Sequence, residues 1–136
     1  MSAGKSILAG LAGIATAVIP TLIADAIAHK VGLYAPPGQA SNDTSLVIAT
    51  IYRVIFGMAG SYVTARLAPN HPMGHSLVLG MIGMLVALGG AVATWNRVAE
   101  FGPHWYPIAL VILSLPQSWA GARIFLSQSS ASAAAK

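Results

Sequence analysis

The sequence predicts an all-α protein: an integral membrane four-helix bundle built from two tandem helical hairpins. Hydrophobic residues make up 56% of the 136 residues and charged residues only 7%, whereas soluble domains carry about 25% charged residues. The mean hydropathy is +0.72. The apolar residues form four long blocks, and a helix needs about 20 mostly apolar residues to cross a bilayer. Each block is therefore long enough for one crossing.

The four predicted spans, within one membrane domain of residues 1–136, cover residues 7–28, 45–67, 77–95 and 106–126. Turn-forming residues separate them: Pro-Pro-Gly and Ser-Asn-Asp after the first span, Ala-Pro-Asn-His-Pro after the second and Phe-Gly-Pro after the third. Because these connections are short, we expect consecutive helices to be antiparallel neighbours. The Ser- and Ala-rich tail over residues 128–136 is expected to be disordered.

The basic residues predict the orientation of the chain in the membrane. One side carries Lys5, Arg66, Arg123 and Lys136. The other side carries only Lys30 and Arg97. Because basic residues favour the cytoplasmic side, we expect both termini in the cytoplasm. The first span could instead be a cleaved signal, but its apolar run exceeds the usual core of about 7–15 residues, which favours a retained helix.

Two parts of the chain, residues 5–67 and 75–126, are predicted to be copies of one hairpin. Residues 6–13, Ser-Ile-Leu-Ala-Gly-Leu-Ala-Gly, match residues 76–83, Ser-Leu-Val-Leu-Gly-Met-Ile-Gly. Residues 61–66, Ser-Tyr-Val-Thr-Ala-Arg, match residues 118–123, Ser-Trp-Ala-Gly-Ala-Arg. The alternative is chance, because Gly and Ala are common in membrane helices.

Small residues that recur on one helix face predict where the helices touch. In lipid there is little hydrophobic drive between helices, so close approach of the backbones across small residues provides the packing. The predicted packing positions are Gly10, Gly13, Gly57, Ser61, Gly80 and Gly83. A surplus face of this kind could also join a second copy of the chain.

Asp25 and Arg53 are the charged residues that interrupt the apolar spans, and Tyr52 lies beside Arg53. A charge inside the membrane costs on the order of 2.5–3.5 kcal/mol, so it usually faces protein or water. In an antiparallel hairpin the two side chains lean toward each other and could meet. The sequence leaves two interpretations: a structural ion pair, or a polar intramembrane site that Tyr52, His29 and Asn96 could join.

The sequence gives little support for disulfides, metal or nucleic-acid binding, or catalysis. The chain has no cysteine, which excludes disulfides and thiolate metal sites. Its basic residues are scattered, so we expect no nucleic-acid partner. His71 and His75 stand one helical turn apart, but Pro72 interrupts them, and we expect no metal or other cofactor. An enzyme acting on lipid, with His104 or Glu100 as acid-base group, is a third alternative that no residue spacing supports.

The stretch Gly-Ser-Tyr-Val-Thr-Ala-Arg-Leu-Ala-Pro over residues 60–69, followed by Pro72-Met73 and later Trp105-Tyr106-Pro107, resembles small bacterial four-helix inner-membrane proteins of uncharacterised function. The resemblance covers roughly the C-terminal two thirds of the chain. It implies a location in the bacterial inner membrane. It implies no activity and no functional residues.

The many small residues and few polar residues of the spans favour a non-enzymatic accessory or scaffold subunit. Its expected partners are the lipid bilayer and either a second copy or another membrane protein. The rival is a small transporter or channel module, in which two or more chains enclose a path lined by Asp25, Tyr52 and Arg53.

Overall fold

The computed structural model describes residues 2–36, 39–98 and 102–135. It contains four helices and, over those residues, no strand: α1 (Ser2–Lys30), α2 (Asp43–Leu67), α3 (Pro72–Thr94) and α5 (Trp105–Ala135). All four are long and apolar enough to cross a membrane. The predicted all-α four-helix bundle is therefore confirmed, and each predicted span lies within one helix or extends at most one residue past its end.

The helix ends follow from local residue chemistry. Asn42 caps α2, since its side-chain oxygen accepts a hydrogen bond from the backbone N–H of Ser45 at 2.8 Å. Pro72 opens α3, where its missing N–H leaves no hydrogen bond unmade. Gly102, with a φ of 91°, provides the left-handed backbone before α5.

The C-terminal tail differs from its expected disorder. Helix α5 continues without a break through Ala135. The residues after the predicted span include no Gly or Pro, and alanine has the highest helix propensity of all residues. A helix that is already formed can therefore extend through this stretch, because adding a residue to an existing helix costs less than starting a new one.

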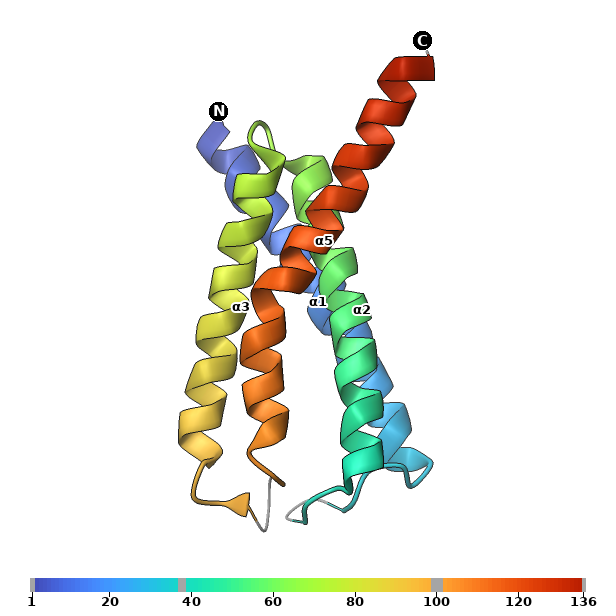
Figure 1. The fold of residues 1–136 in the computed structure, drawn as a ribbon, viewed down its shortest axis with the longest axis vertical. Coiled ribbons are helices and arrows are strands. Elements are labelled where there is room, and N and C mark those ends of the chain that lie inside the picture. The colour runs from blue at the N-terminus through green and yellow to red at the C-terminus, as the bar shows by residue number, and fades with distance from the viewer. Residues whose placement is uncertain (1, 37–38, 99–101, 136) are drawn as a thin grey trace.

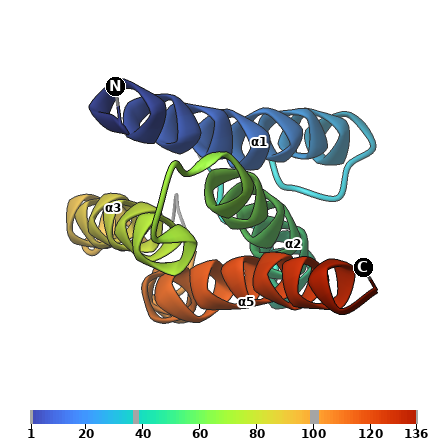
Figure 2. The same cartoon turned by 90° about the horizontal axis from the view of Figure 1, so that it is seen from above.

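The helices form two hairpins, α1 with α2 and α3 with α5, that are joined mainly by contact between α2 and α5. Both termini lie at the same end of the bundle as the turn between α2 and α3 (Figure 1). Figure 1 also shows the two hairpins spreading apart toward the opposite end. Seen along the bundle, α2 lies between α1 and α5 (Figure 2). Helix α2 is thus the central element of the fold.

The distribution of residues is the reverse of that in a soluble protein. Apart from Leu46, the buried side chains among the described residues are small, and the largest that are fully buried are Thr64, Ser61 and Ser76. Large apolar side chains point outward instead: Val86 is 72% exposed and Val92 is 71% exposed. A surface of this kind suits hydrocarbon, and small residues inside allow close helix packing.

Hydroxyl groups link the helices through backbone carbonyls. Thr64 of α2 donates to the carbonyl of Ala9 in α1 at 3.0 Å. Ser61 donates to the carbonyl of Ser118 in α5 at 2.5 Å, and Ser76 of α3 donates to the carbonyl of Ser61 at 2.9 Å. These three bonds connect α2 to each of the other helices, all at buried positions where lipid offers no alternative partner.

Four of the six predicted packing residues lie where two helices meet. A Cβ at Gly13 would overlap Thr64 and stand 2.7 Å from the carbonyl oxygen of Gly60. A Cβ at Gly57 would overlap the Gln117 side chain. One at Gly80 would stand 2.6 Å from the Ser118 hydroxyl. Ser61, the fourth, is completely buried against α5.

Gly10 and Gly83 do not share this role. No atom of another helix lies within 4 Å of the place where a Cβ would stand on either residue. The sequence alignment pairs Gly10 with Gly80 and Gly13 with Gly83, yet within each pair only one glycine is in contact. The two hairpins therefore use different glycines at their crossings, and the internal repeat stays a prediction.

Candidate polar site between α1 and α2

The side chains of Asp25 and Arg53 form an ion pair between α1 and α2. Arg53 Nη2 donates to Asp25 Oδ2 at 2.7 Å. Asp25 lies near the end of α1, and Arg53 lies in the half of α2 that follows the connecting loop. Because the two helices are antiparallel, both charges fall at a similar depth. The pairing that the sequence allowed is therefore present.

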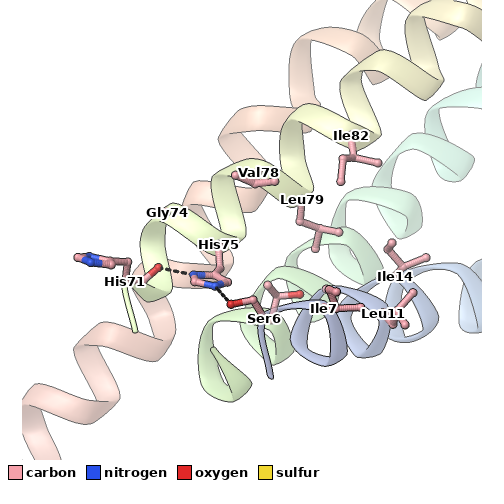
Figure 3. A pocket seen from close by; sticks show the side chains of 12 residues that line it. Ser6, Ile7, Leu11, Ile14, His71, Gly74, His75, Val78, Leu79 and Ile82 are labelled. Atoms are coloured by element: carbon pink, nitrogen blue, oxygen red, sulfur yellow. Dashed lines mark hydrogen bonds between the residues drawn. The ribbon is translucent and has the colours of Figure 1, made fainter. Parts of the chain in front are cut away.

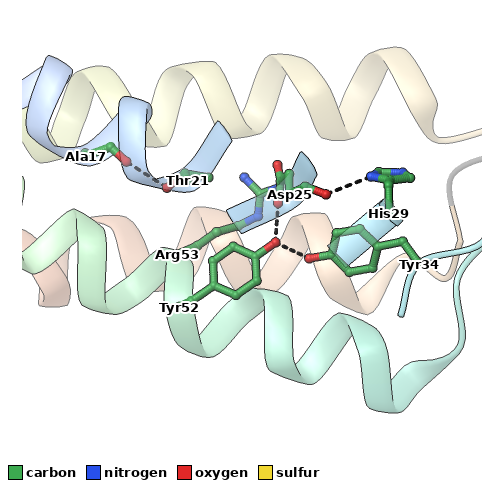
Figure 4. Close-up of polar contacts among 7 residues, drawn as sticks. All are labelled: Ala17, Thr21, Asp25, His29, Tyr34, Tyr52 and Arg53. Carbon is green, nitrogen blue, oxygen red and sulfur yellow. Dashed lines mark hydrogen bonds and ion pairs between the residues drawn. The ribbon is translucent and has the colours of Figure 1, made fainter. Parts of the chain in front are cut away.

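Tyr52 completes the coordination of the Asp25 carboxylate. Its hydroxyl donates to Asp25 Oδ1, while Arg53 binds Oδ2 (Figure 4). The Tyr34 hydroxyl in turn bonds to the Tyr52 hydroxyl. Because Tyr52 already donates its only hydroxyl proton to Asp25, Tyr34 must be the donor in this second bond. The hydrogen bonds therefore run in one direction, from Tyr34 through Tyr52 to Asp25.

Sequence reasoning missed Tyr34, which lies in the loop between α1 and α2. The ring of Tyr34 packs edge-on against His29, with 5.1 Å between ring centroids and an angle of 76°. Burial raises the pKa of Tyr34 above its ordinary value of 10.0, so its hydroxyl stays protonated at neutral pH and can donate. The loop thus covers the end of the site with a tyrosine.

Two further predicted members, His29 and Asn96, take different positions. His29 stands next to the site, where its Nδ1 donates to the backbone carbonyl of Asp25 at 2.9 Å (Figure 4). Asn96 lies instead with Trp95 at a surface hollow between α3 and α5. The structure therefore adds His29 to the surroundings of Asp25 and leaves Asn96 elsewhere.

Helix α5 contributes Tyr106, which lies close enough to Arg53 to interact with its guanidinium electrostatically. The Arg53 Nε atom is buried and has no hydrogen-bond partner. The Arg53 side chain as a whole is 31% exposed, and that of Asp25 is 22% exposed. The cluster of Asp25, Tyr34, Tyr52, Arg53 and Tyr106, here called the polar cluster, therefore touches both hairpins and is partly open to its surroundings.

Both oxygens of the Asp25 carboxylate are engaged within the polar cluster. A carboxylate bound to a guanidinium and a tyrosine is well compensated for its removal from water. The same bonds fix α1, α2 and the connecting loop relative to one another. Chemically, the arrangement is suited to holding these elements together, and a solute could bind to it only by displacing one of the bonds.

Aromatic residues organise the same end of the bundle around α5. Trp95 stacks on His104 with 3.6 Å between ring centroids, and His104 Nε2 donates to the Trp95 carbonyl at 2.7 Å. Trp105 Nε1 donates to Asp43 at 3.0 Å, which ties the start of α5 to the start of α2. His104, a candidate acid-base group, is thus held by Trp95, while Glu100 lies outside the described residues.

His71 and His75 stand at the other end, at the start of α3. His75 Nδ1 donates to the carbonyl of His71 at 3.0 Å, and its Nε2 lies 2.8 Å from the Ser6 hydroxyl. Within residues 2–36, 39–98 and 102–135, no three His, Asp or Glu side chains gather as metal ligands would. Both ring nitrogens of His75 thus have partners in the protein.

Comparisons with protein families, with curated proteins and with solved structures find no match to this chain. Its function therefore has to be inferred from the geometry of its own residues.

Proposed function

We propose that this chain is a non-enzymatic multi-pass membrane protein that acts as an accessory or scaffold subunit. The proposal depends on one observation: the polar groups inside the bundle bind other groups of the bundle. Ser61, Thr64 and Ser76 bind backbone carbonyls of neighbouring helices, and Asp25 and Arg53 bind each other. These groups hold the helices together and leave large apolar side chains on the outside, as expected for a protein whose role is assembly within lipid.

Helix α3 is the surface that we assign to a partner. Gly83, Gly89 and Gly90 have open space where a Cβ would stand. Glycine destabilises a helix by about 1 kcal/mol relative to alanine, and no atom of another helix lies within 4 Å of the place where a Cβ would stand on these three glycines. Small residues let a second membrane helix approach closely. A helix from another membrane protein, or from a second copy, would use that space.

Site-specific photo-crosslinking in native membranes tests this proposal. A photoreactive amino acid at Val86 or Val92 probes α3, and one at Ile19 or Leu22 probes the equally apolar surface of α1. We expect one discrete protein adduct from the α3 positions and none from the α1 positions. Equal labelling from both helices, or no protein adduct from α3, would contradict the scaffold role.

We further propose that the membrane is a bacterial inner membrane and that both termini face the cytoplasm. The support is the clustering of Lys5, Arg66 and Arg123 at the end of the bundle that carries the termini. A C-terminal green fluorescent protein fusion should fluoresce, and a C-terminal alkaline phosphatase fusion should be inactive. The reverse pattern would invert the orientation.

The second candidate is a small transporter or channel module built around the polar cluster. It is favoured by the buried Arg53 Nε atom, which has no partner, and by the partial exposure of Asp25. In this case wild-type protein in liposomes would conduct an ion or solute, and Arg53→Leu would abolish that flux while the protein still folds. Arg123→Leu, outside the cluster, is the matched control. Absence of flux through the wild type would remove this candidate.

A further inference from the structure

A groove of about 650 Å³ lies between α1 and α3 near the end of the bundle that carries the termini (Figure 3). Ile7, Leu11 and Ile14 of α1 form one wall, and Leu79 and Ile82 of α3 belong to the other. The volume is typical of a small-molecule site. The groove is separate from the polar cluster, which lies toward the opposite end.

The length of the groove corresponds to one leaflet of a bilayer. On α1 it runs from Ser6 to Ile14, about 12 Å at 1.5 Å per residue. On the other side it runs from His71, which caps α3, to Ile82 within α3, about 16 Å on the same measure. Half of a hydrocarbon core measures about 15 Å. The apolar part of the groove therefore reaches from the membrane surface to near the midplane.

The polar end of the groove is built from Ser6 and His75, which face each other from α1 and α3 (Figure 3). The bond from His75 Nδ1 to the carbonyl of His71 fixes the ring, so that Nε2 points at the Ser6 hydroxyl. In Figure 3 the His71 ring points away from this pair. A polar pair at the mouth of an apolar groove matches a ligand with a polar head and an apolar tail.

The charges at this end favour an anionic head. Lys5 precedes Ser6, and Arg66 lies in the last turn of α2, at the same end of the bundle. Among the described residues, both carboxylates lie far away: Asp25 is about 28 Å from Ser6 along α1, and Asp43 begins α2 at the opposite end. Basic residues at a membrane surface attract anionic lipids.

From these observations we infer that the groove between α1 and α3 binds one anionic glycerophospholipid of the leaflet on the side of the termini. One acyl chain lies along the apolar walls. The phosphate lies beside Ser6 and His75, where the Ser6 hydroxyl can turn from His75 Nε2 to donate a hydrogen bond to it and Lys5 contributes positive charge. A second copy of the chain could also cover apolar walls, but it offers no reason for basic and polar groups at the mouth of the groove.

Gly10 gives a direct test, because it lines the groove and has open space where a Cβ would stand. Gly10→Leu places an apolar side chain in the groove, and no atom of another helix lies within 4 Å of the place where its Cβ would stand. Ala15→Leu is the matched control, since Ala15 is exposed on α1 but does not line the groove. Full-length protein in detergent is titrated with phosphatidylglycerol or phosphatidylcholine, and bound lipids are counted by native mass spectrometry.

We expect the wild type and Ala15→Leu to retain one phosphatidylglycerol in preference to phosphatidylcholine. We expect Gly10→Leu to bind it about tenfold more weakly, because the leucine takes the space of about two methylene groups of the acyl chain. The double variant Ser6→Ala/His75→Gln should lose the preference between the two lipids while its melting temperature stays near that of the wild type. Equal affinity of the wild type for both lipids, unchanged binding in Gly10→Leu, or a dimer that only Gly10→Leu abolishes would overturn the inference.

Discussion

The bond between Asp25 and Arg53 allows a quantitative test of whether the polar cluster holds the fold together. We consider Asp25→Asn, which keeps an oxygen for the Tyr52 hydroxyl but removes the charge, and Arg53→Gln, which removes the partner charge. Each single change leaves one charge in the membrane without its 2.7 Å partner. Breaking a buried pair costs about 3–5 kcal/mol and an unpaired charge at membrane depth about 2.5–3.5 kcal/mol.

Asp25 and Arg53 lie toward one end of their helices, so a charge left unpaired can extend to the headgroups, which lowers these figures. We therefore expect each single variant to lose about 2–3 kcal/mol of unfolding free energy. The double variant Asp25→Asn/Arg53→Gln buries no unpaired charge. It should lose less than the sum of the single variants by about 1–3 kcal/mol, as found for residues in direct contact.

The assay is equilibrium unfolding in mixed micelles, with helix content followed by circular dichroism for the wild type and the three variants. If the loss in the double variant equals the sum of the two single losses, the charges do not stabilise each other, and the assignment of the polar cluster to a structural role is refuted. Flux measurements on the same four proteins then separate a structural pair from a transport site.

Three further predictions concern the helix contacts and use the same unfolding assay. Gly13→Ala should lose about 1–3 kcal/mol, because its Cβ would overlap Thr64, whereas Gly83→Ala should be neutral or gain up to about 1 kcal/mol; equal effects would contradict the assigned contacts. Ser61→Ala should lower the free energy of unfolding by about 0.6 kcal/mol, because it loses the bond to Ser118; an unchanged free energy would show that this bond does not stabilise the fold. Trp105→Phe should cost no more than about 1 kcal/mol, because the bond that it loses to Asp43 is exposed and water can replace the indole N–H; a loss above about 2 kcal/mol would contradict this.

The sequence was sufficient to predict the spans and to identify Asp25 and Arg53 as two charges that could meet, because each inference follows from a single dominant energy. Crossing hydrocarbon requires a long apolar helix, and the four blocks are longer than any connection between them. A charge in the membrane requires compensation, and the antiparallel arrangement of a short hairpin brings Asp25 to the level of Arg53. Neither inference depends on details of side-chain packing.

The rest depended on tertiary geometry that residue patterns do not encode. Tyr34 reaches the polar cluster only because of the path taken by the loop after α1. Gly60 and Gly121 pack as closely as the predicted glycines, but which helix they contact can be stated only once the position of the neighbouring helix is known. A crossing places few residues of each helix in close contact, so a stripe of small residues predicts a face and not the contact point along it.

Because small residues lie inside and large residues outside, the positions that tolerate substitution are the opposite of those in a soluble protein. In a soluble domain the large apolar side chains are the ones that substitution damages, whereas here positions such as Val86 and Ile112 can exchange one aliphatic side chain for another against fluid lipid. The positions most sensitive to substitution are the buried alanines Ala9, Ala65 and Ala122, where an added methylene would overlap neighbouring atoms. A saturation scan of this chain would therefore show its strictest requirements at alanines, serines and a few glycines.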